Sequence, residues 1–421
     1  MLRRAPVAAT RRAVEMTASP SARPCPVCGG ASGRVLFRQQ FAAVDSATPV
    51  TGYDVVTCAS CGCGYADEIP DQRAFDRYYR EMSKYEYHQR DGAESEFDQR
   101  RLAVIADIIA PHVPSRGARI LDIGCATGRL LANLRERGFP NVTGLDPSPA
   151  CAAAAHRLYG IPVRTMTLAD LGVTDERFDV AILVGVLEHL RDLDEAFQHL
   201  RTILEPGGLL YVEVPDATAF ADWPNAPFQD FSTEHINFFA PQSLDNLMAQ
   251  RGFSRMFAEQ NHREQSHRTV MSNVSAIYRK EPDGITLPLT FDPATAGGLE
   301  RYIAGCRRED ERLHELIGRI ADSGRPILVW GVGTHTSRLL ATSRLGEARI
   351  VAFIESNARY HGKELAGRPI IAPAELAQRP EAVLISSRVF QHEIAKQLRD
   401  DLHCHNDLIL LYEIPGDATS S

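Results

Sequence analysis

Continuous apolar runs alternate with amphipathic stretches in two regions of the chain, and this pattern predicts buried strands with helices between them. The first region carries four such runs, at residues 118–122, 141–146, 178–184 and 209–214. The second region also carries four, at residues 326–331, 349–354, 382–386 and 407–412. Strands that alternate with helices form a parallel sheet covered on both faces, so we expect an α/β protein with two Rossmann-like units.

The segments outside these runs complete the expected organisation. Residues 24–75 are rich in Cys, Gly and Pro, whereas a Pro/Gly-dense stretch precedes the charged amphipathic helix that starts near Leu299. The Arg-rich, acid-poor start favours a disordered extension, with an organelle transit peptide as the alternative. We therefore expect an extension (1–23), a cysteine-rich module (24–75), an α/β domain with a helical lead-in (76–280), a linker (281–298), and a helix followed by a second Rossmann-like domain (299–421).

The composition of the chain excludes several classes of protein. Hydrophobic residues make up 44% of the 421 residues and charged residues 24%, close to the averages of soluble globular proteins. A net charge of -8 argues against a surface that coats nucleic acid. The apolar runs are all shorter than the about 18 residues of a membrane span. We expect a cytoplasmic monomer or homodimer with reduced thiols and with no nucleic-acid or membrane partner.

Five of the nine cysteines lie between Cys25 and Cys63. Four of them form two C-x2-C pairs separated by 29 residues: Cys25, Cys28, Cys58 and Cys61. Two such pairs complete the tetrahedral thiolate set of a structural zinc ion, which leaves no open coordination position. A redox C-x-x-C motif is the alternative, although such a motif normally occurs once. We expect residues 24–75 to be a zinc-binding module, with Cys63 as a spare thiol.

A glycine-punctuated turn follows the first predicted strand, in the sequence Leu121-Asp-Ile-Gly-Cys-Ala-Thr-Gly128. The glycines at 124 and 128 let the backbone pass close to a ligand at the start of the next helix. Asp122 precedes the first glycine by two residues, where a carboxylate favours a cation over a pyrophosphate. Asp146 ends the second strand and is placed to accept hydrogen bonds from ribose hydroxyls.

These residues resemble motifs I and II of the class I S-adenosylmethionine (SAM) methyltransferases, which carry D-x-G-x-G-x-G and a ribose-binding acid. Downstream segments agree with the resemblance: Phe178-Asp179 opens a strand, Leu187-Glu-His-Leu190 follows it, and Leu204-Glu-Pro-Gly-Gly-Leu209 precedes the next. The resemblance implies SAM as the cofactor; a Rossmann fold that binds another ligand is the alternative. It implies these cofactor-binding residues: Asp122, Gly124, Cys125, Gly128, Asp146, Pro147, Glu188 and His189.

The segment after the last of these strands carries the candidate acid–base chemistry. Ligands of open α/β sheets bind beyond the carboxyl ends of the strands, where we expect Glu234 and His235 to lie. A histidine beside a carboxylate can act as a general base near neutral pH. An ordinary capping pair is the alternative, and the Glu188–His189 pair is a rival for the same role.

The whole-chain arrangement resembles the sugar C-methyltransferases, which methylate a nucleotide-linked keto-deoxysugar at the carbon beside its ketone. Their loop motif Tyr-His-Glu-His is matched here by Ser232, Thr233, Glu234 and His235, so the tyrosine is replaced. Their later His-Gly-Gly-Ser-x-Arg stretch is absent. Their Tyr-rich segment persists as Tyr78-Tyr79 and Tyr85-Glu-Tyr87.

This resemblance implies that His235, oriented by Glu234 and with Tyr79 as a further catalytic residue, removes a proton α to a carbonyl. The carbanion would then take the methyl group of SAM. The acceptor would be a nucleotide-linked keto-sugar or a related small natural-product intermediate. Two alternatives stay open: O- or N-methylation of a small molecule or glycan at the same site, and a non-catalytic assembly protein that binds SAM and zinc.

Overall fold

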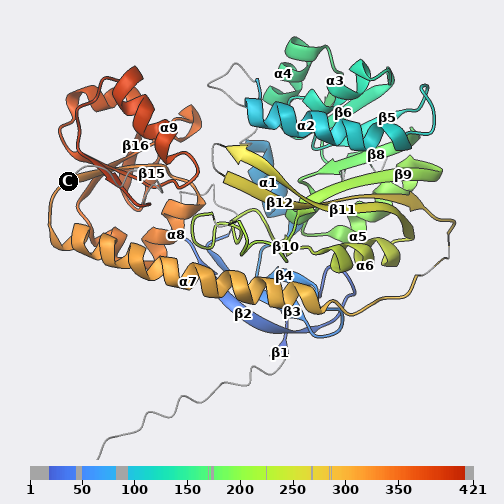
Figure 1. The fold of residues 1–421 in the computed structure, drawn as a ribbon, viewed down its shortest axis with the longest axis horizontal. Coiled ribbons are helices and arrows are strands. Elements are labelled where there is room, and N and C mark those ends of the chain that lie inside the picture. The colour runs from blue at the N-terminus through green and yellow to red at the C-terminus, as the bar shows by residue number, and fades with distance from the viewer. Residues whose placement is uncertain are drawn as a thin grey trace, which may run out of the picture.

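The structure, a computed structural model, consists of three sheets with helices packed around them (Figure 1). It describes residues 19–43, 50–81, 93–168, 170–171, 175–223, 225–266, 269–283, 285 and 287–412. Among these residues, none of the helices combines the length and the hydrophobicity that a membrane span needs. Both expected Rossmann-like units are present, so the predicted α/β fold class is confirmed.

The central sheet has seven strands in the order β11-β12-β9-β8-β5-β6-β7. The strands are β5 (Ile120–Ile123), β6 (Val142–Asp146), β7 (Val163–Thr165), β8 (Phe178–Val184), β9 (Leu204–Pro215), β11 (Phe253–Ser266) and β12 (Thr269–Lys280). The first five are parallel, whereas β11 and β12 form an antiparallel hairpin that pairs with β9. The chain winds outward in both directions from β5, and ligands of open sheets bind at such a switch point.

Helices cover both faces of this sheet (Figure 1). One face carries α2 (Glu96–Ile109), α3 (Arg129–Glu136) and α4 (Pro149–Tyr159), and the other carries α5 (Leu193–Ile203) and α6 (Pro241–Gln250). Along β8, Val180 and Ile182 enter the core under α2 and α3, whereas Ala181 and Leu183 enter the opposite core. Both side-chain sets of a strand are therefore buried, which explains the continuous apolar runs in the sequence.

A five-stranded antiparallel sheet contains the cysteine-rich module. Its strands are β1 (Ser19–Pro20), β2 (Ser32–Gln40), β3 (Gly52–Cys58), β4 (Gly64–Asp67) and β10 (Asn237–Phe238). β10 comes from the segment after β9, so this sheet takes one strand from the α/β domain. α1 (Gln72–Glu81) follows β4 in the chain.

The start of this module corrects one expectation. A disordered extension reaching residue 23 is wrong at its end, because β1 pairs with β2 and Arg23 is only 2% exposed. The Arg23 guanidinium donates hydrogen bonds to the carbonyl oxygens of Ala66 and Ile236. These bonds hold the chain between β4 and β10; the earlier residues, 1–18, lie outside the described part.

The helix α7 (Pro293–Asp322) begins earlier than predicted, inside the expected linker 281–298. Asp292 caps it by accepting hydrogen bonds from backbone N–H groups of its first turn. The Gly297-Gly298 pair indicated a linker, but Gly298 serves close packing instead. A Cβ on Gly298 would lie 2.6 Å from the Ala217 carbonyl oxygen, so only glycine allows this approach.

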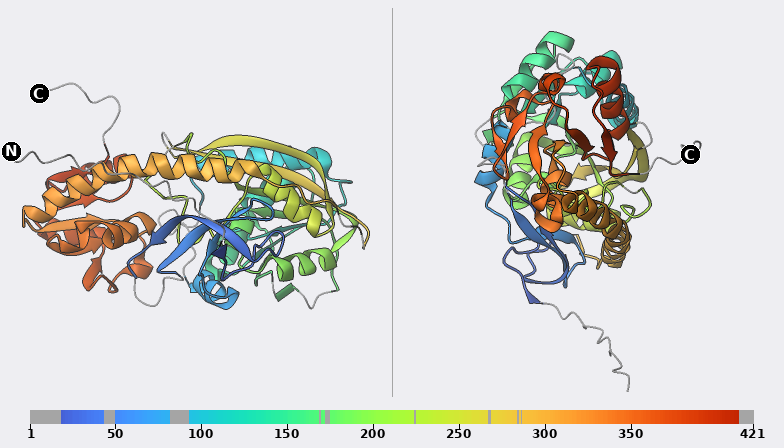
Figure 2. Two further views of the ribbon diagram at one scale, coloured as in Figure 1. Left: turned by 90° about the horizontal axis from the view of Figure 1, so that it is seen from below. Right: turned by 90° about the vertical axis from the view of Figure 1, so that its left-hand side faces the viewer.

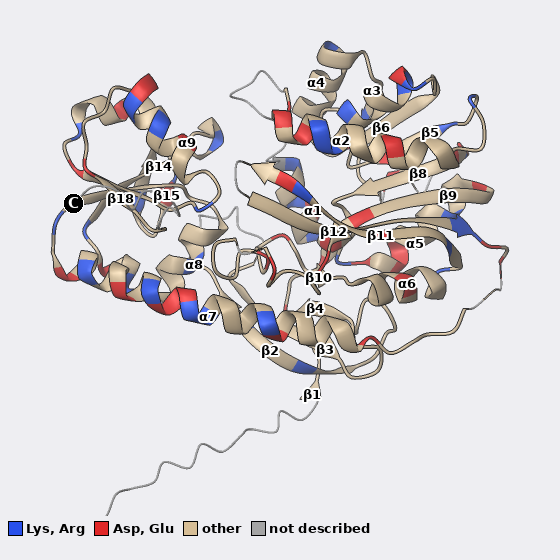
Figure 3. Ribbon diagram, in the orientation of Figure 1, with Lys and Arg blue, Asp and Glu red and all other residues tan. Residues whose placement is uncertain are grey.

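α7 packs into two separate cores. Leu299, Tyr302 and Ile303 in its first half contact the core of the five-stranded sheet, and Leu313 and Ile317 in its second half enter the core of the C-terminal unit. Figure 2 shows the helix running along the molecule from one unit to the other. Acidic and basic residues are interspersed along the second half of the helix (Figure 3).

The C-terminal sheet has the order β15-β16-β14-β13-β17-β18 and is parallel except for β15. Its strands are β13 (Ile327–Trp330), β14 (Ile350–Ile354), β15 (Glu364–Leu365), β16 (Arg368–Ile371), β17 (Ala382–Ile385) and β18 (Leu408–Leu410). α8 (Thr334–Thr342) and α9 (Gln391–Lys396) follow β13 and β17.

Candidate functional site

The turn from β5 into α3 lies at the switch point of the central sheet. Gly124 and Gly128 have positive φ angles of 75° and 78°, which favour glycine. A Cβ on Gly128 would lie 3.1 Å from the Ala155 Cβ of α4, so the turn also packs closely against that helix. The backbone N–H of Gly124 donates to the Leu145 carbonyl oxygen at 2.8 Å, which ties the turn to the end of β6.

Two carboxyl groups stand beside this turn. Asp146 Oδ2 accepts a hydrogen bond from Ala126 N, and its Oδ1 accepts one from Ser148 N, both at 2.9 Å. Asp122 is buried on β5, and burial together with the Asp146 charge raises the pKa of Asp122 well above its usual value. A nearby cation would favour the ionised form of both groups. The pair therefore suits a ligand that carries a positive charge and hydroxyl groups.

Cys125 and Pro147, two predicted cofactor residues, have different surroundings. A Cβ on Gly144 would lie 2.4 Å from Cys125 Sγ, so the thiol points toward β6, and burial raises its pKa. Pro147 separates Asp146 from Ser148, whose hydroxyl caps α4. The Cys125 side chain is thus a packing group of the sheet.

Glu94 is a site residue that the sequence analysis missed. It is buried just before α2, and its carboxylate accepts hydrogen bonds from Thr127 Oγ1 in the glycine turn and from Tyr159 Oη at 2.5 Å. The Arg129 guanidinium lies over the Tyr159 ring, 5.3 Å from its centroid. The lead-in to the α/β domain is thereby fastened to the turn. An acid 33 positions before a threonine is no motif, so the sequence offered no signal for this contact.

Replacing Glu94 by alanine is expected to lower the free energy of unfolding by about 1–3 kcal/mol, because the buried Thr127 hydroxyl loses its acceptor. Chemical denaturation monitored by circular dichroism measures the change. Tyr159→Phe removes only one of the two hydrogen bonds and is expected to cost less. An E94A variant as stable as the wild type would contradict this role.

A second cluster forms where α1, the short helix η6 (Leu187–His189) and the segment after β9 meet. His189 Nδ1 lies 2.9 Å from Tyr79 Oη and 3.0 Å from the Glu234 carbonyl oxygen. Because a carbonyl oxygen can only accept a hydrogen bond, Nδ1 carries the proton of the neutral His189 ring. Nε2 of this ring then carries the lone pair and is the acceptor nitrogen. The His235 ring packs edge-on against His189, with centroids 4.8 Å apart. The structure thus joins the two predicted Glu-His pairs in one cluster.

The Glu234 carboxylate is bound to α1. Its Oε1 accepts a hydrogen bond from Tyr78 Oη at 2.9 Å, and burial together with the Glu234 charge raises the pKa of Tyr78. The Ser232 hydroxyl accepts hydrogen bonds from the backbone N–H groups of Glu234 and His235. Ser232 therefore shapes the turn that presents this pair. Tyr85 and Tyr87 lie outside the described residues.

The C-terminal unit approaches the same cluster. Tyr360, in the short helix η8 (Ala358–Tyr360), has a pKa raised to about 12 by burial and by the charges of Glu355 and Glu234. The Arg388 guanidinium donates to the Asn225 carbonyl oxygen at 2.9 Å, which holds the segment after β9 from this side. The candidate acid–base residues therefore lie where the two α/β units meet.

The four predicted metal ligands converge in the N-terminal sheet. Their sulfur atoms lie within 4.8 Å of one another, with 3.5 Å between Cys25 and Cys61 and 3.6 Å between Cys28 and Cys58. Four sulfurs at about 2.3 Å from a tetrahedral zinc ion would be about 3.8 Å apart, so the set fits this metal. The neighbouring sulfurs raise the pKa of the Cys61 thiol, and a cation would offset that repulsion. Cys63 Sγ instead donates to the Gly64 carbonyl oxygen.

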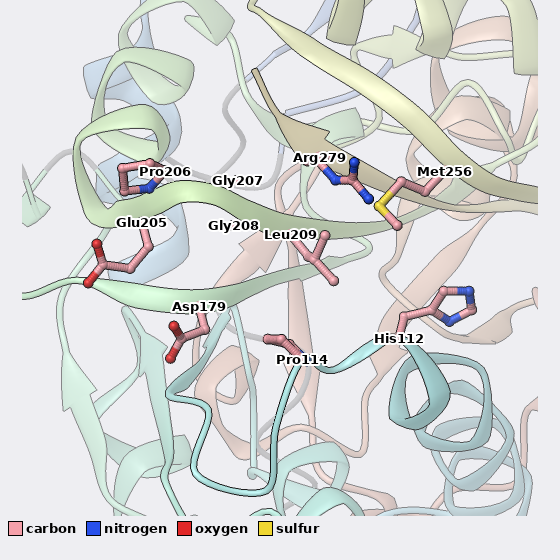
Figure 4. A pocket seen from close by; sticks show the side chains of 10 residues that line it. All are labelled: His112, Pro114, Asp179, Glu205, Pro206, Gly207, Gly208, Leu209, Met256 and Arg279. Carbon is pink, nitrogen blue, oxygen red and sulfur yellow. The ribbon is translucent and has the colours of Figure 1, made fainter. Parts of the chain in front are cut away.

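Figure 4 shows a surface pocket of about 320 Å³. Asp179 at the start of β8, Glu205 and Gly207 near the start of β9, and Arg279 near the end of the antiparallel β12 line it. These positions are at the amino ends of the parallel strands. The glycine turn and the histidine cluster follow the carboxyl ends, so the pocket belongs to the opposite edge of the sheet.

Comparison with known proteins agrees with this geometry. Residues 96–255 match the model of a family described as methyltransferase domain, and residues 324–410 match one described as C2185-like, N-terminal. A ubiquinone biosynthesis O-methyltransferase of Chelativorans sp. is 34% identical over 135 residues, which cover 29% of this chain and 53% of that protein. A tRNA U34 carboxymethyltransferase of Azotobacter vinelandii is 36% identical over 111 residues, covering 25% and 35%.

The chain thus spans about half the length of the ubiquinone-pathway relatives it matches. Among solved structures, the Burkholderia thailandensis 1,6-didemethyltoxoflavin-N1-methyltransferase has a TM-score of 0.39 at 20% identity, and the alignment covers 53% of this chain and 97% of that one. Residues 96–255, which contain the five parallel strands of the central sheet, are thus similar to a methyltransferase domain.

Proposed function

We propose that the chain is a SAM-dependent methyltransferase that acts on a small-molecule acceptor. The observation that carries this proposal is the glycine turn and Asp146 at the switch point, with the Tyr79–His189–His235 cluster beyond the end of β8. SAM supplies an electrophilic methyl group when bound. Asp146 would accept hydrogen bonds from its ribose hydroxyls, and Asp122 with the backbone of the turn would hold its methionine end.

The finer proposal is methylation of a carbon beside a carbonyl group. His235 would take the proton from that carbon, and the resulting carbanion would form the bond to the methyl group while the sulfonium charge is lost. Holding both reactants in line supplies much of the rate. The acceptor would be a nucleotide-linked keto-sugar or a related natural-product intermediate, placed between the units where Tyr360 and Glu355 approach. This substrate class rests on the resemblance to sugar C-methyltransferases.

A second candidate is O-methylation, which the names of the ubiquinone-pathway relatives favour. His235 would then deprotonate a hydroxyl group, and the cofactor site would be the same. N-methylation would need no general base if the acceptor amine is already neutral. A non-catalytic protein that binds SAM and a structural zinc ion is the remaining alternative, and it predicts SAM binding without methyl transfer.

Isothermal titration calorimetry with SAM tests the shared premise. We expect micromolar affinity and one site per chain, because the cofactor-binding turn and its two carboxyl groups are intact. The absence of binding at millimolar SAM would overturn both the enzyme and the assembly-protein proposals.

Replacing His235 by glutamine is expected to slow solvent-deuterium exchange at the α-carbon of a nucleotide-linked keto-deoxysugar by about 10²–10⁴-fold, the usual contribution of a general base. The SAM dissociation constant should stay within about twofold. His262→Gln is a matched control, because this ring stacks on Trp223 along β11. If the wild type exchanges no deuterium but methylates a hydroxyl acceptor, the O-methylation proposal replaces the finer one.

A further inference from the structure

We infer that Glu188, and not Glu234, is the carboxylate that raises the basicity of His235. Glu188 would therefore be a positioning residue that acts through the histidine. The inference rests on the proposed function for the role of His235 as a base. It concerns an ionisation equilibrium, however, and this can be measured without turnover.

The first argument is proximity. One carboxylate oxygen of Glu188 and one ring nitrogen each of His189 and His235 lie within 4.8 Å of one another. An opposite charge at about 4–6 Å favours a protonated imidazole by about 1–3 pKa units. Glu188 is 3% exposed, so water screens its charge weakly.

The second argument decides which histidine takes the proton. Glu188 Oε1 lies 3.9 Å from His189 Nε2, so His189 also feels the carboxylate. His189, however, is buried, and its Nδ1–H is directed at the Glu234 carbonyl oxygen. His235 is half-buried, so a positive charge on its ring costs less desolvation. The geometry therefore gives His189 the role of a neutral spacer and His235 that of the proton acceptor.

The third argument concerns the neighbouring acid. The Glu234 carboxylate accepts the hydrogen bond from Tyr78 Oη, which directs it toward α1 and fixes the segment that carries His235. Its charge also acts on Tyr360 of the C-terminal unit. Glu234 thus fixes the segment that carries His235, and it is Glu188, not Glu234, that forms the 4.8 Å group with the two histidine rings. Among the described residues, the titratable and charged groups of the elements that pack around this segment include Tyr78 and Tyr79 of α1, Glu188 and His189 of η6, Glu234 of the segment itself, Tyr360 of η8, and Arg23, which donates to the Ile236 carbonyl oxygen.

The test is a pH titration of the ring ¹⁵N signals of the full-length chain, with the His235 signals assigned by their loss in H235Q. Because a carboxylate raises the pKa of a neighbouring imidazole, Glu188→Gln is expected to lower the His235 pKa by at least about 1 unit. Glu188→Asp keeps the charge and should restore part of the shift. The isosteric control Glu234→Gln should change this pKa by less than about 0.5 unit.

The pH profile of kcat/KM gives the second readout. A base must be deprotonated, so its activity is lost as the pH falls through its pKa, and in E188Q the acid limb should move to lower pH by the same amount. A His235 pKa that is equal in wild type and E188Q would overturn the inference. A lowered pKa with an unmoved acid limb would uphold the role of Glu188 but refute His235 as the base. Stoichiometric binding of added Zn²⁺ by both histidines, lost in E188Q, would overturn the inference in favour of a metal site.

Discussion

Replacing Cys61 by serine is expected to remove one zinc ion per chain and to lower the free energy of unfolding by several kcal/mol. Structural zinc contributes about 10–16 kcal/mol of binding free energy in small zinc domains, and that energy is available only to the folded form. A hydroxyl group is a far weaker zinc ligand than a thiolate, so a three-thiolate remnant would hold the metal poorly.

The effect should reach beyond the zinc module. Cys25, Cys58 and Cys61 belong to the same buried cluster as Leu183 of β8 and Leu244 of α6. The four-sulfur cluster is therefore part of the core that supports one face of the central sheet. We expect C61S to unfold the central α/β domain at a lower temperature, and not merely to loosen the N-terminal sheet.

Elemental analysis and thermal unfolding measure the two parts of this prediction. Cys63→Ser is the matched control, because Cys63 is two positions away and equally buried but its sulfur donates to the Gly64 carbonyl oxygen. That variant should keep one zinc ion. Wild-type protein without zinc, or equal metal loss in both variants, would contradict a four-thiolate site.

Replacing Asp146 by asparagine should weaken SAM binding about 100-fold. A hydrogen bond to a charged group contributes about 1.5–3 kcal/mol, and the ribose would lose its charged acceptor. The substitution should also destabilise the turn between β5 and α3. The Asp146 oxygens accept from two backbone N–H groups, those of Ala126 and Ser148. An amide offers one oxygen and one NH₂ group, so either orientation sets a donor against a donor.

Calorimetry with SAM measures this effect, and circular dichroism confirms that the variant is folded. Asp179→Asn is the control at the opposite edge of the same sheet, where its carboxylate accepts from Arg119 N at 2.7 Å. SAM affinity should stay within about twofold of wild type in D179N. A folded D146N variant that binds SAM like the wild type would exclude Asp146 from the cofactor site.

The features that depend on local sequence, namely strands, tight turns and paired cysteines, could be predicted. The central strands of the two α/β sheets are buried on both faces, which leaves uninterrupted apolar runs such as Phe178–Val184. The glycine turn could be predicted because residues 124 and 128 have positive φ angles, which favour glycine. Two C-x2-C pairs predicted one four-sulfur cluster, and the four sulfur atoms do converge.

Contacts between residues that are far apart in the sequence could not be predicted. Tyr78 and Glu234 are 156 positions apart, and no spacing rule connects them. The Gly297-Gly298 pair looked like linker composition, because the sequence does not show that the backbone near Ala217 comes within reach of the helix. The same holds for β10, a two-residue strand whose partner β4 lies in another module.

The long helix α7 has a consequence for how reactants enter and leave. Its 30 residues span about 45 Å, and each half is embedded in a different core. Swinging the C-terminal unit away from the five-stranded sheet would require breaking that helix or pulling one half out of its core. We therefore expect ligands to enter and leave through rearrangement of surface segments, while the helix keeps the distance between the two cores fixed. Small-angle scattering profiles recorded with and without SAM should therefore superimpose.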